Sequence, residues 1–71
     1  MKISARNVLA GKVVKVTEGA VNAEVVIEVA PGVNITSMIT KRSLVDLGLK
    51  EGKKAYAVVK ASSVMVGVDH D

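Results

Sequence analysis

The sequence predicts an all-β fold, an OB-like five-stranded barrel with one short helix. Of its 71 residues, 22 are β-branched (15 valines, 4 isoleucines and 3 threonines), and such side chains favour strands. Apolar and polar residues alternate in short segments that are separated by turn-forming residues, which is the pattern of half-buried strands. One segment breaks this alternation and has helical spacing. The resulting order, three strands, a helix and two strands, is that of an OB-type barrel.

Three strands are expected before the helix. The first covers residues 3–16, and Gly11 in its middle predicts a bulge or a sharp bend. The second covers residues 21–29, where every second side chain is apolar. The third covers residues 35–39. Turn-forming residues separate these strands at positions 17–20 and 30–34, the latter with a Pro-Gly pair.

The helix and two more strands complete the predicted fold. Thr40 is a suitable N-cap for a helix of about two turns, and Gly48 suits the position after its last turn. A turn at Glu51-Gly52 precedes a fourth strand at residues 55–60. The break Ala61-Ser62-Ser63 then separates it from a fifth strand at residues 64–68. Residues 69–71 form a tail, so the chain is predicted to be one domain, residues 1–71.

Composition limits the chemistry that this chain can perform. The sequence has no cysteine and one histidine, His70, which excludes disulfides and zinc-thiolate sites and argues against a Ser-His-Asp triad or any cation site. Glu24 and Glu28 fall on one face of the second strand and are expected to be solvated or to form an intersubunit ion pair. No nucleophile has a partnered base, so we expect no enzyme. A domain this small buries only about 60% of its unfolded surface, so extra stability is expected from oligomerisation.

The charge of the chain suits an anionic partner. The net charge is +3 and the pI is near 9.5, which favours anions without naming one. No apolar run approaches the roughly 20 residues of a membrane span, and no signal peptide opens the sequence. We therefore expect a cytoplasmic protein without a membrane partner.

Three polar clusters each combine hydroxyl groups with a cation. A tetrahedral dianion is bound by such a mixture of positive charge and neutral donors, and a helix start adds free N–H groups. Thr40 and Ser43 are explained equally well as helix caps, and Lys60 as a solvated strand end, so both interpretations remain open. The clusters are Ser4-Ala5-Arg6-Asn7, Thr40-Lys41-Arg42-Ser43 and Lys60-Ala61-Ser62-Ser63.

Five segments together resemble the molbindin family, whose members are also called molybdenum-pterin-binding or Mop proteins. The resemblance spans nearly the whole chain and suggests the free-standing form of the TOBE/Mop-type molybdate-binding domain. The combination of the first and third segments is the most specific part. The segments are SARN (4–7), GKVV (11–14), TEGAVNAEV (17–25), LGLKEG (47–52) and KASSV (60–64).

The resemblance implies both an assembly and a ligand. Subunits would exchange a strand and form a hexamer, a trimer of dimers, that holds molybdate or tungstate between subunits for intracellular storage. Ser4, Arg6 and Lys60 of one subunit, and Thr40 and Ser43 of its neighbour, would hold the oxyanion. Ser62 and the backbone N–H groups of Ala5 and Ala61 would assist. A second oxyanion site, nearer the assembly axis, would involve Gly19, Ala20, Val21 and Asn22.

Two other functions are alternatives to oxyanion binding. A nucleic-acid-binding OB domain is favoured by the barrel and the basic pI, but base stacking needs exposed rings and Tyr56 is the only aromatic residue of the sequence. The same lack of rings argues against a requirement for pterin. A structural oligomer without a ligand is the other alternative, and the molybdenum or tungsten content of the purified protein would distinguish it.

Overall fold

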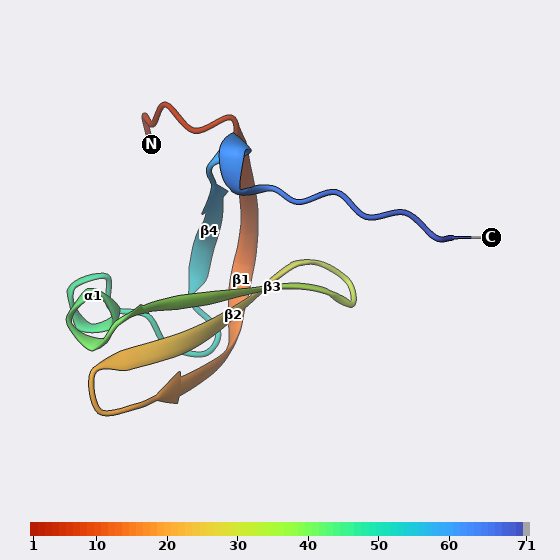
Figure 1. Cartoon of the computed structure of the whole chain (residues 1–71). Coiled ribbons are helices and arrows are strands. Elements are labelled where there is room, and N and C mark those ends of the chain that lie inside the picture. The colour runs from red at the N-terminus through yellow and green to blue at the C-terminus, as the bar shows by residue number, and fades with distance from the viewer. Residues whose placement is uncertain (71) are drawn as a thin grey trace.

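The computed structural model describes residues 1–70 and consists of one curled antiparallel sheet with a short helix (Figure 1). The sheet has the strand order β3-β2-β1-β4, which confirms the all-β class. Asp71, the end of the predicted tail, lies outside the described residues. The elements are β1 (Asn7–Glu18), β2 (Asn22–Ala30), β3 (Val33–Thr40), α1 (Lys41–Asp46), β4 (Lys54–Val59) and the 3-10 turn η1 (Ala61–Ser63).

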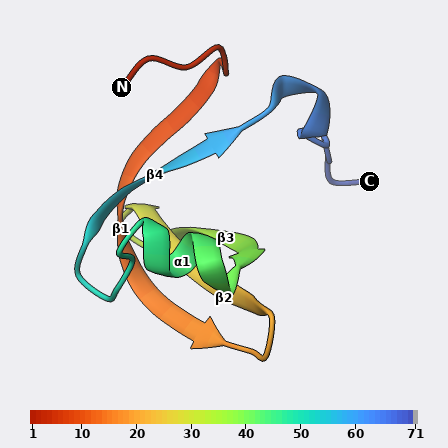
Figure 2. The ribbon, with the colours of Figure 1, turned by 90° about the vertical axis from the view of Figure 1, so that its left-hand side faces the viewer.

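The long strand β1 gives the sheet its curl. Its first half pairs with β4 and its second half with β2, and Lys12 has a partner on both sides. Gly11 lies against β2, where an added Cβ would overlap the carbonyl oxygen of Glu28 and approach Ile27 Cγ2 to 2.8 Å. The register shifts between Val13 and Lys15, so the irregularity predicted at Gly11 occurs just beyond it. The β1–β4 and β2–β3 ribbons therefore cross and form a half-barrel (Figures 1 and 2).

A small aliphatic core fills the concave side of this sheet. Val13 and Val25 are almost completely buried. Leu44 of α1 joins them, and the helix lies against β2 and β3. The remaining buried core residues among those described are Ala23, Ile27 and Ala57. With so few buried side chains, a single chain has little apolar stabilisation of its own.

The start of the helix confirms its predicted cap. Ser43 N donates to Thr40 Oγ1 at 3.1 Å, and the Thr40 hydroxyl contacts Ser43 Oγ at 2.9 Å. The helix ends at Asp46, and Gly48 follows with a φ of +61°. Glycine adopts this left-handed conformation without the steric cost that a Cβ imposes.

The predicted fifth strand is not formed within the chain. Residues 64–70, which we call the arm, extend away from the sheet after η1 (Figure 1). Met65, Val66 and Val68 are each about nine-tenths exposed. A strand needs a neighbour to accept and donate its backbone hydrogen bonds, and the arm has none within residues 1–70. In this described part of the chain, the outer edges of β3 and β4 also have no neighbouring strand.

Candidate oxyanion-binding site

Two of the three predicted polar clusters meet at one end of the sheet. Asn7, the first residue of β1, pairs with Val59, the last residue of β4. Because the two strands are antiparallel, the residues before β1 and those after β4 leave the sheet side by side, as Figure 1 shows for the N-terminal segment and η1. A hollow lies between them, which we call the anion groove. Its lining residues are Ile3, Ser4, Ala5, Arg6, Lys60, Ala61 and Ser62.

The anion groove carries the chemistry that a dianion requires. From the described part of the chain, its lining contains two cations and two hydroxyl groups, and no carboxylate. Neither Arg6 nor Lys60 forms an ion pair with any residue that the structure describes. Both charges are therefore available to a ligand from solution, and charge-assisted hydrogen bonds are the strong ones for such a ligand.

The third predicted cluster lies elsewhere in the chain. Thr40 and Ser43 mark the start of α1, which lies against β2 and β3, whereas the anion groove is at the far end of the β1–β4 ribbon (Figure 1). Neither residue lines the anion groove. One chain thus unites six of the eight residues predicted for the first site, and leaves Thr40 and Ser43 apart.

The residues predicted for a second oxyanion site lie together in and beside the β1–β2 turn. Gly19, Ala20, Val21 and Asn22 line one hollow, and Gly19 N donates to Asn22 O at 2.8 Å. Glu18 and Glu24 also line it, and Lys41 Nζ is 4.0 Å from Glu18 Oε1. These two carboxylates were not among the residues predicted for the site, and their charge opposes an anion. This hollow therefore differs in character from the anion groove.

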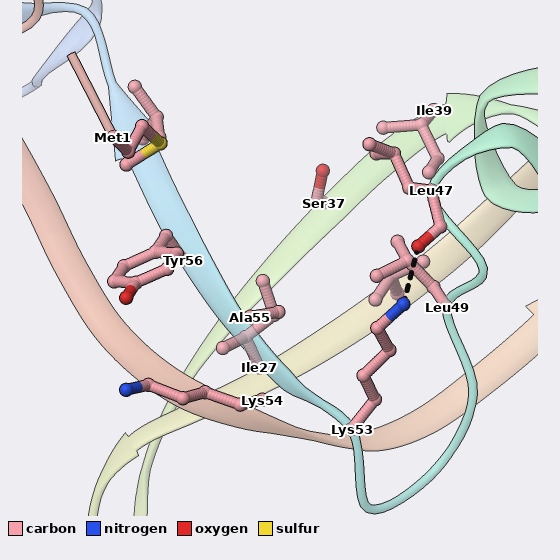
Figure 3. Close-up of a pocket in the computed structure, with 12 residues that line it drawn as sticks. Met1, Ile27, Ser37, Ile39, Leu47, Leu49, Lys53, Lys54, Ala55 and Tyr56 are labelled. Carbon is pink, nitrogen blue, oxygen red and sulfur yellow. Dashed lines mark hydrogen bonds between the residues drawn. The ribbon is translucent and has the colours of Figure 1, made fainter. Parts of the chain in front are cut away.

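An apolar groove also opens along the concave side of the sheet, where edge strands β3 and β4 face each other. Ile27, Ala55, Ile39 and Leu49 are among the side chains that line it (Figure 3). Lys53 closes one end, where its ammonium group donates to the Leu47 carbonyl at 2.8 Å. We call it the edge groove. No local pattern in the sequence indicates the edge groove, because it is formed by two strand edges that are distant in sequence.

Metal-binding groups and membrane-spanning helices were sought in the described part of the chain. Residues 1–70 contain no group of three or more His, Asp or Glu side chains arranged to hold a metal ion. In that same part of the chain, no helix has the length and apolar character needed to span a bilayer.

The half-barrel with its short helix belongs to a known class of domain. Residues 3–66 match the family model described as the TOBE domain. Molybdenum-pterin-binding protein 3 of Clostridium pasteurianum is 54% identical over 93% of this chain and 97% of its own length. This chain belongs to the molybdenum-pterin-binding (Mop) family, as its sequence resemblance predicted.

Solved structures agree with this assignment. Apo MopII from Clostridium pasteurianum superposes with a TM-score of 0.89 at 52% identity, over 94% of this chain and all of that one. The cytoplasmic molybdate-binding protein ModG, in a form with molybdate bound, superposes with a TM-score of 0.92 at 51% identity. That alignment covers 97% of this chain and 49% of ModG, so this chain has about half the length of ModG.

Proposed function

We propose that this protein binds molybdate, and its near-isostere tungstate, for intracellular molybdenum storage and homeostasis. The anion groove carries the proposal. Among residues 1–70 it brings together two cations that form no ion pair and two hydroxyl groups, without a carboxylate. The relatives support the choice of anion. One is named for molybdenum-pterin binding, and ModG is described as a molybdate-binding protein with molybdate bound.

The chemistry of binding follows from the charge of the ligand. Molybdate carries a charge of −2, which Arg6 and Lys60 neutralise. Ser4 and Ser62 donate hydrogen bonds to the anion without neutralising its charge. The backbone N–H groups of Ala5 and Ala61 add two more donors. Charge-assisted hydrogen bonds contribute roughly 1.5–3 kcal/mol each, so a handful gives micromolar binding. The oxyanion stays chemically unchanged, which is the role of a binding protein and not of an enzyme.

A neighbouring subunit completes the site in this proposal. Thr40 and Ser43, which lie away from the anion groove of their own chain, contribute hydroxyl groups to the groove of the next chain. In the same assembly, the β1–β2 turns of neighbouring subunits come together. Gly19, Ala20, Val21 and Asn22 then form a second oxyanion site. Because Glu18 and Glu24 line the hollow at this turn, we propose that the oxyanion binds more weakly here than in the anion groove.

Exchange of the arm supplies the contact between subunits. Val64, Val66 and Val68 share one face of an extended arm, and the edge groove is lined mainly by aliphatic side chains. The arm leaves its own sheet (Figure 1), so we propose that it enters the edge groove of a second copy. There it becomes the fifth strand between β3 and β4 and closes the OB-like barrel. Three such dimers form a hexamer.

The assembly is tested by sedimentation at micromolar concentration. We expect a hexamer of the 7.4 kDa chain, because one chain alone exposes the apolar arm and the edge groove to water. Removal of residues 64–71 removes the proposed fifth strand and should lower the mass of the particle. A full-length protein that sediments as a monomer would contradict the assembly and the shared sites together.

The ligand is tested by thermal unfolding in the presence of different oxyanions. Molybdate and tungstate should raise the melting temperature, because a ligand at 100 times its Kd stabilises the folded state by about 2.7 kcal/mol per independent site. Phosphate should raise it less. Phosphate is partly protonated near neutral pH, and a groove of donors favours a fully deprotonated anion. Equal shifts with molybdate and phosphate would show that the groove does not discriminate between them.

The remaining assignments follow from the same proposal. We propose that residues 1–71 act as a single molybdate-binding module in the cytoplasm, the compartment given for ModG. Pterin is not required, since stacking on its ring would need aromatic side chains. Tyr56 lies at the edge groove under the ammonium of Lys54, 5.7 Å from the ring centre. A single ring in this position is also a poor platform for nucleic-acid bases.

A further inference from the structure

The arm begins at the anion groove. Lys60 is the N-cap of η1, and the turn is closed by Ser63 N donating to Lys60 O at 2.8 Å. Val64 N then donates to Ala61 O at 3.2 Å. These two hydrogen bonds set the direction in which the chain continues into the arm. We call residues 60–64 the arm root.

The arm root forms one wall of the anion groove. Lys60, Ala61 and Ser62 face the opposite wall, Ser4 to Arg6. That opposite wall is continuous with β1, which is fixed to β4 by the Asn7–Val59 pairing. No side-chain hydrogen bond or ion pair joins the two walls among the described residues. A bound anion would therefore supply the polar link between the arm root and the sheet.

We propose that an oxyanion in the anion groove fixes the arm root and so slows the exchange of arms between copies of the chain. This inference rests on the proposed molybdate site and the exchanged arm. For an arm to leave its partner, the arm root must change direction, and Lys60 and Ser62 then lose their contacts with the anion. A ligand that binds one conformation more tightly stabilises it against the other. The coupling is reciprocal, so a seated arm also favours binding of the anion. Bound molybdate thus holds the exchanged arm in place, an effect that we call the lock.

Subunit exchange measured by native mass spectrometry tests this lock. Unlabelled and isotopically heavy oligomers are mixed, with and without saturating molybdate, and the appearance of oligomers of mixed mass is followed. We expect molybdate to slow exchange by about tenfold or more, since loss of one charge-assisted contact is worth at least that factor. Calorimetric titration of the same samples measures binding separately.

Two insertion variants show whether the arm root is responsible. Two glycines inserted between Ser63 and Val64 separate the arm from the anion groove, and exchange should then lose most of its slowing by molybdate while the oxyanion still binds. The slowing that remains is the part due to Thr40 and Ser43 of the neighbouring subunit. The same insertion in the exposed β2–β3 turn, after Gly32, is the matched control and should retain the slowing. The arm-root variant also has an internal check, because calorimetry shows directly whether its groove is intact.

The outcomes separate this inference from the proposed function. If molybdate binds but exchange is equally fast with and without it, the lock is wrong and the proposed function stands. If the arm-root insertion binds molybdate and still shows the full slowing, the effect comes from another part of the interface, such as Thr40 and Ser43, and the lock is again wrong. If calorimetry detects no molybdate binding to the wild-type protein, the proposed function fails, and the lock fails with it.

Discussion

Arg6→Ala is expected to weaken molybdate binding by about thirtyfold or more, without unfolding the protein. Arg6 lies on one wall of the anion groove and forms no ion pair with the described residues. Its alternative role, as an ordinary surface arginine, would contribute only about 0–1 kcal/mol. Removing a cation that faces a desolvated dianion costs about 2–5 kcal/mol, which corresponds to thirtyfold or more in Kd. Calorimetric titration distinguishes the two roles.

Two further variants make this measurement specific. Ser62→Ala removes one neutral donor of the same groove and should cost about 0.5–1.5 kcal/mol. Lys15→Ala removes the same unit of charge from β1, outside the lining of the groove, and should leave Kd nearly unchanged. Each variant is first checked by sedimentation, because the site also joins subunits. If Arg6→Ala remains assembled and binds molybdate as the wild type does, Arg6 is not a ligand, and Lys60 with the Thr40 hydroxyl must hold the anion.

Gly11→Ala is expected to lower the melting temperature by roughly 5–20 °C. A Cβ at this position would overlap the Glu28 carbonyl oxygen and lie 2.8 Å from Ile27 Cγ2. The first of these is backbone in the centre of the sheet, so β1 and β2 must move apart. Overpacking of this kind costs about 1–3 kcal/mol, and each kcal/mol shifts the melting temperature of a domain this size by about 4–8 °C.

The neighbouring residue provides the control for this substitution. Ala10→Ser changes an exposed side chain of the same strand and should shift the melting temperature by only a few degrees at most. Both proteins are compared at one concentration, since assembly makes the melting temperature depend on concentration. If Gly11→Ala has the same melting temperature as the wild type, the packing of β1 against β2 at Gly11 is looser than the structure indicates.

Local pattern in the sequence determined the elements and the identity of the polar clusters. The alternation over residues 21–29 predicted β2, and the β-branched content predicted the all-β class. Thr40 predicted the start of α1 because an N-cap satisfies N–H groups within its own first turn. Ser4, Arg6 and Lys60 were identified as candidate ligands from residue type and from the family resemblance. Apart from the resemblance, which spans nearly the whole chain, these signals act within a few residues along the chain.

Tertiary structure alone decided which of these parts meet. Alternation shows which side chains share a face but not which strand lies alongside, since pairing depends on contacts between residues far apart in sequence. The β1–β4 pairing brings Ser4–Arg6 beside Lys60–Ser62, and the start of α1 remains apart from them. The same reason explains the one element that the sequence predicted and the chain does not form. Residues 64–68 have the pattern of a strand, but a strand exists only where another strand offers its edge.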